Sequence, residues 1–307
     1  MTSLRISHQS RAIVVASSLL CSALSLGSSA APDPTYRSTV EEVRLTFVAT
    51  DEHNRILDAL KPGDFAVIDD ELVIRKFRSF TRSDESKLDI TVLVDSSESV
   101  VSHFRQEITD VLRLMADSKS IAEDNVSVIS FGGTRSTIIC SGNCRKSSPV
   151  QQLFALSPQG ATPFFDAVVF AANQVSERRD PLVRPVMILF SDGADTVSRN
   201  SAADAVQAAI ESNAQVYAVD LNKPGFLSKG SLTLQSIADA TGGRYFTIGE
   251  GAIKVLGDVL EDLHAAYVVT YQLPGRDIGF HPVRILPTHN LNLRFRCRHG
   301  YYQRMVN

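Results

Sequence analysis

Apolar and polar residues alternate along this chain in two different patterns. Between about residues 88 and 265, short apolar runs are separated by segments in which apolar residues recur every three or four positions. The runs predict strands that are buried on both faces, and the wider spacing predicts amphipathic helices. This alternation favours an α/β fold with a doubly wound, mostly parallel sheet and helices on both faces.

The segments on either side of this region have the period-2 alternation of half-buried strands. Before it, the pattern occurs in residues 43–47 and in a predicted hairpin at residues 65–74. After it, three more stretches have the composition of strands: residues 267–273, 283–286 and 291–297. Because either set alone has too few strands for a stable sheet, we expect the N- and C-terminal strands to pair in one small β unit.

Four parts of the chain follow from these patterns. They are a signal peptide (1–30), an N-terminal β segment with a linker (31–87), an α/β domain (88–265), and a C-terminal β segment that pairs with the N-terminal one (266–307). Arg5 and Arg11, a following apolar stretch and small residues around Ala30 predict the signal peptide and its cleavage. That stretch is shorter than the roughly 20 residues of a membrane span. We therefore expect export to the periplasm or the exterior, without membrane insertion.

Composition and charge narrow the class of partner. With 44% apolar and 21% charged residues, the chain can bury a sizeable core. The formal net charge is only -3 and there is no basic cluster, so nucleic acid is not an expected partner. No basic amphipathic helix points to binding at a membrane surface.

Three cysteines remain after the predicted signal peptide. Cys140 and Cys144 are close enough in sequence to close a small loop by a disulfide, which export permits. A metal-binding pair is the alternative, but no second Cys/His pair with ligand spacing accompanies it. The disulfide is the favoured interpretation, and Cys297 is expected to be buried and unpaired.

Oxygen-bearing side chains follow two of the predicted strands and precede one predicted helix. The motifs are Asp95-Ser96-Ser97-Glu98-Ser99, Thr162 before Pro163, and Asp192 before Gly193. Open α/β sheets bind ligands at the carboxyl ends of their strands, so we expect these motifs to meet there. Hydroxyl and carboxylate oxygens suit a hard cation, Mg²⁺ first, with Ca²⁺ or Mn²⁺ as alternatives. Taken alone, Thr162 and Pro163 would be a helix N-cap and first helical residue.

Together these motifs resemble the metal-ion-dependent adhesion site of von Willebrand factor A (VWA) domains, a Rossmann-like α/β family. The resemblance implies that Ser97, Ser99 and Thr162 bind the ion directly, and that Asp95 and Asp192 act through bound water. Neutral hydroxyl ligands would neutralise the charge of the ion only in part. An Asp or Glu carboxylate of a protein partner would therefore bind strongly as the last ligand.

Further stretches resemble a narrower group, the exported VWFA-related proteins first noted in acidobacteria. These stretches are residues 65–67, 237–243, 267–271 and 300–301. Asp69-Asp70-Glu71 departs from that pattern, because a glycine is expected in the hairpin turn. The departure affects the type of hairpin and not the function.

Two other function classes compete with an adhesion or interaction module. An enzyme is disfavoured because the chain has no Gly-x-Ser-x-Gly, no His-Glu-x-x-His and no glycine-rich phosphate loop. Among enzymes, only a Mg²⁺-dependent hydrolase remains as an alternative, because a Mg²⁺ site with acids can support phosphoryl hydrolysis. A scaffold protein of the cell envelope, whose metal site is only stabilising, is the main alternative. Glu98, Asp166 and Asp195 are interpreted as helix-start or turn acids rather than ligands.

Overall fold

The computed structural model describes residues 42–82, 87–116, 124–142, 144, 149–178, 180, 182–223, 225, 227–247, 252–274 and 277–303. The predicted signal peptide, residues 1–30, lies outside the described residues. In the described part of the chain, no helix is long and apolar enough to cross a membrane.

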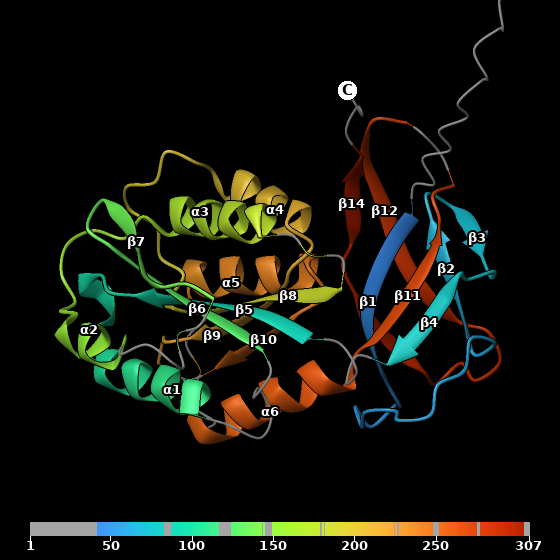
Figure 1. Cartoon of the computed structure of the whole chain (residues 1–307), viewed down its shortest axis with the longest axis horizontal. Helices are drawn as coiled ribbons and strands as arrows, with labels where there is room; N and C mark the ends of the chain where they lie inside the picture. Colours follow the sequence, from blue (N-terminus) through green and yellow to red (C-terminus); the bar gives the residue numbers. More distant parts are fainter. Residues whose placement is uncertain are drawn as a thin grey trace, which may run out of the picture. The chain divides into compact units, whose positions relative to one another are not determined.

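Strands and helices alternate through the α/β part of the chain (Figure 1). Its strands are β5 (Lys87–Asp95), β6 (Asn125–Gly132), β7 (Arg135–Cys140), β8 (Val183–Ser191), β9 (Gln215–Asp220) and β10 (Arg244–Thr247). Its helices are α1 (Phe104–Ala116), α2 (Pro149–Ala155), α3 (Phe164–Glu177), α4 (Ala202–Glu211), α5 (Lys229–Ala240) and α6 (Ala252–Ala265). Helix α2 was not predicted from the sequence.

The six strands described here form one sheet in the order β10-β9-β8-β5-β6-β7. All neighbours are parallel except β7, which lies antiparallel to β6 at the edge. The predicted doubly wound, mostly parallel sheet is therefore confirmed. Strand β5 lies inside the sheet, and every residue after Lys87 in it is buried.

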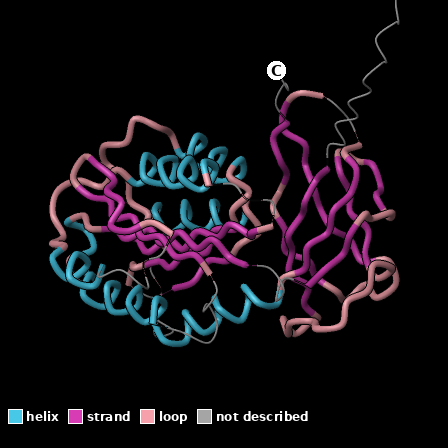
Figure 2. Tube along the Cα trace, viewed as in Figure 1, coloured by secondary structure: helices cyan, strands magenta, loops and turns pink. Residues whose placement is uncertain are grey.

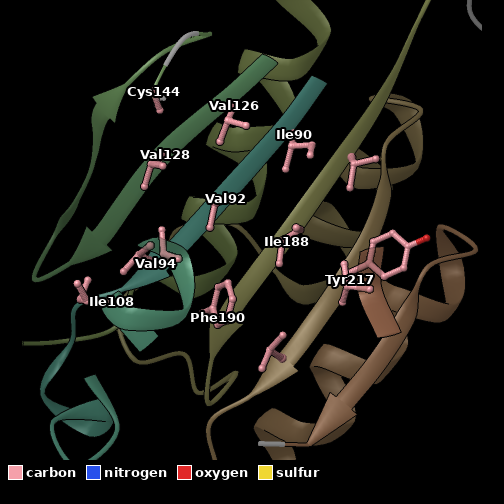
Figure 3. Packing of buried hydrophobic residues seen from close by; sticks show 14 of the residues in the cluster. Ile90, Val92, Val94, Ile108, Val126, Val128, Cys144, Ile188, Phe190 and Tyr217 are labelled. Carbon is pink, nitrogen blue, oxygen red and sulfur yellow. The ribbon is translucent and has the colours of Figure 1, made fainter. Parts of the chain in front are cut away.

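Helices cover both faces of this sheet (Figure 2). On one face, Val92 and Val94 of β5 pack with apolar residues of α1, α2 and α6 (Figure 3). On the other face, Leu93 packs with apolar residues of α3, α4 and α5. The continuous apolar run of β5 is explained by this double burial, which fixes the place where the strand ends at Asp95.

The remaining strands form two antiparallel four-stranded sheets within the described residues. The strands are β1 (Glu42–Thr50), β2 (Phe65–Asp69), β3 (Leu72–Ile74), β4 (Ser79–Arg82), β11 (Tyr267–Gln272), β12 (Gly279–Pro287), β13 (Arg294–Cys297) and β14 (Gly300–Gln303). The sheet orders are β13-β1-β11-β4 and β14-β12-β2-β3. Each sheet contains strands from both ends of the chain, as predicted.

The β unit has an aromatic core. Phe65 is 1% exposed, and its ring centroid lies 5.0 Å from that of Phe47 and 5.1 Å from that of Phe77. The polar composition of residues 81–87 predicted that they form the linker. Strand β4 instead continues through Thr81 and Arg82 and pairs with β11, so these two residues are not part of a linker. Pairing with β11 overrides the polar composition from which the linker was predicted.

Two of the cysteines form a disulfide and Cys297 is unpaired. A disulfide joins Cys140 of the edge strand β7 to Cys144. The backbone N–H of Cys144 also donates to the carbonyl oxygen of Val126 in β6, at 3.1 Å. Cys297 forms no disulfide and is partly buried, and its burial raises the pKa of the thiol to about 11.

Candidate metal centre

Asp95 lies at the carboxyl end of β5 and is fully buried. Its Oδ1 accepts a hydrogen bond from the backbone N–H of Ser97 at 2.9 Å, and its Oδ2 accepts one from the hydroxyl of Ser191 at 2.6 Å. Both carboxylate oxygens are therefore fixed by donors from the ends of neighbouring strands. Such an oriented carboxylate can bind the water of a metal ion while keeping its position.

Ser97 and Ser99 provide two hydroxyl oxygens beside this carboxylate. Their Oγ atoms share a hydrogen bond and lie 3.0 Å apart. Two adjacent ligands of octahedral Mg²⁺, each bound at about 2.1 Å, lie about 3.0 Å from each other. The spacing of the hydroxyls thus fits the ion. Ser97 is buried and Ser99 is exposed, so the pair spans the boundary between the protein interior and solvent.

Thr162 is not the N-cap that the sequence predicted. Helix α3 begins at Phe164, its N-cap residue is Pro163, and no side chain caps it. The backbone of Thr162 is instead bound to Thr196: its N–H donates to Oγ1 at 2.8 Å, and its carbonyl accepts from the N–H at 2.9 Å. The prediction failed because pairing with the loop after β8 outweighs capping.

The loop before Thr162 is also joined to the serine motif. The N–H of Glu98 donates to the carbonyl of Gly160 at 3.1 Å, and the N–H of Gln159 donates to the carbonyl of Ser96 at 3.0 Å. Gly160 has φ +75°, a conformation that favours glycine. Backbone hydrogen bonds therefore connect the three predicted motifs, although they are far apart in sequence.

Asp192 follows β8, which is next to β5 in the sheet. Its Oδ1 accepts from the backbone N–H of Ala194 at 3.0 Å, and its carbonyl oxygen accepts from the amide of Asn222 at 2.8 Å. Gly193, at φ +70°, has room for no side chain, since a Cβ would lie 2.3 Å from the carbonyl oxygen of Gly230. The start of α5 thus fixes the loop that carries Asp192.

Glu107 belongs to this centre but was missed in the sequence. It lies on α1, is fully buried, and its Oε1 accepts from the backbone N–H of Asp95 at 2.9 Å. Its Oε2 has no hydrogen-bond partner among the described residues. Its position in the helix could have revealed it, because Glu107 lies on the same face as the apolar residues Phe104, Ile108 and Val111. An acid on the buried face of a helix is expected to have a specific partner. Ser191, which donates to Asp95, was likewise overlooked.

The acids around the site that were predicted to be structural bind backbone groups. Asp166 accepts from the backbone N–H groups of Arg199 and Asn200, and Asp195 accepts from those of Phe165 and Ser198. Glu98 is exposed. Among the described residues, no group of three or more His, Cys, Asp and Glu side chains could hold a metal. A metal here must therefore rely on hydroxyl as well as carboxylate oxygens.

Burial controls the electrostatics of this centre. It raises the pKa of Asp95 to about 6, against the opposing effect of the hydrogen bonds from Ser191 and Ser97, and the charge of Asp192 raises it further. Burial also raises the pKa of Glu107 well above its ordinary value, and the charge of Asp95 adds to that. Without a metal, the carboxyl groups of Asp95 and Glu107 therefore hold their protons more strongly than usual, and a bound cation would favour their charged forms.

This shift predicts how pH affects the metal-free protein. Between the ordinary value of 3.8 and about 6, the folded state binds a proton on Asp95 that the unfolded chain does not. Stability must fall as pH rises through this window, by on the order of 3 kcal/mol. We expect denaturant unfolding in EDTA to show a larger loss in the wild type than in Asp95→Asn, in which the raised pKa of Glu107 still contributes. Equal pH profiles for the two proteins would contradict the assignment.

Comparison with known proteins identifies the α/β part. A family model described as the von Willebrand factor type A domain matches residues 89–259, more than half of the 307 residues. This chain belongs to that family. The matched range includes Asp95, Thr162 and Asp192, so every predicted ligand lies within the VWA domain. Membership is consistent with a protein-interaction module.

Individual relatives of the chain are distant. The 67 kDa subunit of magnesium chelatase from Chlorobaculum parvum is 22% identical over 204 residues, which covers 61% of this chain and 32% of that protein. This chain therefore spans about a third of the length of that relative. Among solved structures, the manganese-loaded TRAP protein of Plasmodium vivax has TM-score 0.45 and 16% identity, covering 78% of this chain and 99% of that one.

Another solved structure is an aerotolerance-related membrane protein of Bacteroides fragilis. It has TM-score 0.43 and 18% identity, and the match covers 57% of this chain and 98% of that one. At such identities these structures are similar to the chain in fold alone. The function must be argued from the site of this VWA domain.

Proposed function

We propose that this chain is an exported, metal-dependent protein-binding module. A divalent cation, Mg²⁺ first, is held by Asp95, Ser97, Ser99, Thr162 and Asp192, and an acidic side chain of a partner completes its coordination. The observation that carries the proposal is the pair of hydroxyl oxygens 3.0 Å apart beside a buried, oriented carboxylate. Export rests on the predicted signal peptide.

Charge explains why the partner should be acidic. The hydroxyl ligands are neutral, and both oxygens of Asp95 already accept hydrogen bonds from the protein. The ion would thus retain much of its charge on the side where Ser99 is exposed. A carboxylate arriving from that side meets a partly desolvated cation, which is a stronger attraction than between two exposed charges.

The alternative is a scaffold in which the ion only stabilises the fold. The deep hydrogen bonding of Asp95 and Glu107 favours stabilisation as one role of the site, but it does not account for the exposed hydroxyl of Ser99. We carry over no activity from magnesium chelatase, because this chain matches only 32% of that subunit.

Affinity capture from an envelope extract separates the two functions. Bait protein is presented in Mg²⁺, in EDTA, and as the variant Asp95→Asn. We expect a partner that is retained in Mg²⁺ and lost in both other samples, and glutarate added as a free dicarboxylate should compete with it. Capture that survives EDTA and Asp95→Asn at full yield would place the binding surface elsewhere. Asp69→Asn, a change of a buried acid in the β unit, is the matched control and should retain capture.

A further inference from the structure

Strand β3 is a free edge of the β unit. It is the outermost strand in the order β14-β12-β2-β3, and pairs only with β2 among the described residues. Leu72 is 53% exposed and Val73 is 56% exposed, although both are large apolar residues in a strand. An edge of this kind can accept a further strand, because its outward backbone groups are unpaired.

The register shows which backbone groups point outward. Asp69 and Leu72 face each other and close a two-residue turn, so the N–H and C=O of Leu72 and Ile74 point toward β2. The N–H of Asp70 donates to the carbonyl of Pro282 in β12 at 3.0 Å, as this alternation requires. The N–H and C=O of Val73 must then point away from the sheet.

Opposite charges flank this strand. Asp70 and Glu71 precede it, and Arg75 and Lys76 follow it. All four residues are exposed. Asp70 lies 3.4 Å from His281, whereas Glu71, Arg75 and Lys76 form no ion pair within the described part of the chain. The charges of Glu71, Arg75 and Lys76 are therefore available to another molecule.

The backbone of the turn indicates that the acids have a role. Asp70 has φ +49° and Glu71 has φ +69°, in the left-handed region that both positions of such a turn require. Glycine, which the resemblance to the exported VWFA-related proteins implies at this turn, would adopt this conformation at lower energy. Glutamate in this strained position is a backbone outlier that suggests a functional constraint.

We propose that β3 pairs antiparallel with β3 of a second copy of this chain. Centred on Val73, the two-fold arrangement places Val73 opposite Val73 and Leu72 opposite Ile74 of the other copy. Glu71, which ends the turn before β3, comes beside Arg75 of the other copy, just beyond the paired residues. Apolar residues thus meet at the centre, and opposite charges meet at both ends.

The other edge strands described do not offer this complementarity, and β14 has no charged residue at all. Strands β7, β10 and β13 carry arginine and no acid, so an antiparallel pair of two copies of any of them would bring no acid opposite an arginine. In β4, Arg82 is already paired with Asp58, at 2.9 Å. Charged edges normally prevent such pairing. The charges beside β3 would instead direct it to its own copy.

The contact is short, which sets the expected strength. It buries less than the roughly 1,200 Å² of a stable interface, so the dimer should be weak, with Kd on the order of 10⁻⁴ M. It should weaken further in about 1 M NaCl, where the Debye length is about 3 Å. A dimer would present two VWA domains to a partner with repeated acidic groups, which raises avidity.

Charge reversal tests the pairing, measured by sedimentation equilibrium of the chain without its predicted signal peptide, residues 31–307. At about 0.5 mM, several times the expected Kd, the wild type should be largely dimeric. In the variants Glu71→Arg and Arg75→Glu, residues 71 and 75 have the same charge. Because residue 71 of each copy meets residue 75 of the other, the dimer would contain two repulsive pairs, and each variant should be monomeric. An equal mixture of the two variants should form a heterodimer, since every pair is then opposite in charge. The double variant Glu71→Arg/Arg75→Glu should dimerise like the wild type.

Arg284→Glu is the matched control, because it makes the same charge change on the exposed face of β12, inside the same sheet. It should dimerise like the wild type. A wild type that stays monomeric at this concentration would overturn the proposal. So would a dimer that both single variants retain, or a mixture that shows no heterodimer. Circular dichroism of each variant shows that it is folded.

Discussion

Replacing Asp95 with asparagine should remove the Mg²⁺-dependent part of the chain's stability. The carboxylate is fully buried and accepts hydrogen bonds from Ser97 and Ser191, so it helps to hold both residues at the centre. At a Mg²⁺ concentration about 100 times the Kd, binding stabilises the folded wild type by about 2.7 kcal/mol. For a domain of this size that corresponds to roughly 5–10 °C in the unfolding temperature. Thermal unfolding with Mg²⁺ and with EDTA measures the difference.

Asp69→Asn is the control for this prediction. Asp69 is also a fully buried acid, but it lies in the β unit, where it accepts a hydrogen bond from the hydroxyl of Tyr271 at 2.7 Å. The change should lower stability equally in Mg²⁺ and in EDTA, and leave the shift between them unchanged. A full Mg²⁺ shift in Asp95→Asn, or its loss in Asp69→Asn, would show that the ion binds elsewhere.

Gly230→Ala should have the second large effect. A Cβ at this position would lie 2.2 Å from the carbonyl oxygen of Asp192 and 2.7 Å from the carbonyl carbon of Gly193. Both obstacles are backbone atoms, so either the first turn of α5 or the loop with Asp192 must move. We expect a loss of about 3 kcal/mol in stability, and Mg²⁺ affinity lower by about 10- to 100-fold. Denaturant unfolding and calorimetric titration measure the two.

Gly257→Ala is the matched change in another helix. Gly257 lies in α6, and a Cβ there would meet no atom within 4 Å. Alanine has the higher helix propensity, by about 1 kcal/mol, so this variant should be slightly more stable and bind Mg²⁺ as before. If both variants bind Mg²⁺ normally, the contact between α5 and the loop does not position Asp192.

The features that could be predicted from the sequence depend on periodicity. The apolar run of residues 90–94 becomes the buried part of β5, and the alternation at residues 43–47 becomes the inward face of β1. Pairing of β1 with β11 followed from the shortage of partners in either segment. Burial of apolar side chains determines all three features, and the spacing of apolar residues in the sequence predicts that burial.

Other features depend on hydrogen bonds between distant loops, which leave no periodic signal. Thr162 looked like an N-cap, but Thr196 binds its backbone. Glu107 looked like one polar residue on a helix, but it reaches the N–H of Asp95. The turn at Asp70 and Glu71 lacks the glycine that normally marks it, although the hairpin was placed correctly. Tertiary contacts determined each of these local conformations.

The most direct test of the central claim is a titration with Mn²⁺, followed by electron paramagnetic resonance of the free ion. The wild type should bind one ion per chain, Mg²⁺ should displace it, and Asp95→Asn should bind none at the same concentrations. Asp69→Asn should bind one ion like the wild type. Equal binding by the wild type and Asp95→Asn, or no saturable binding by the wild type, would contradict a metal centre at the end of β5.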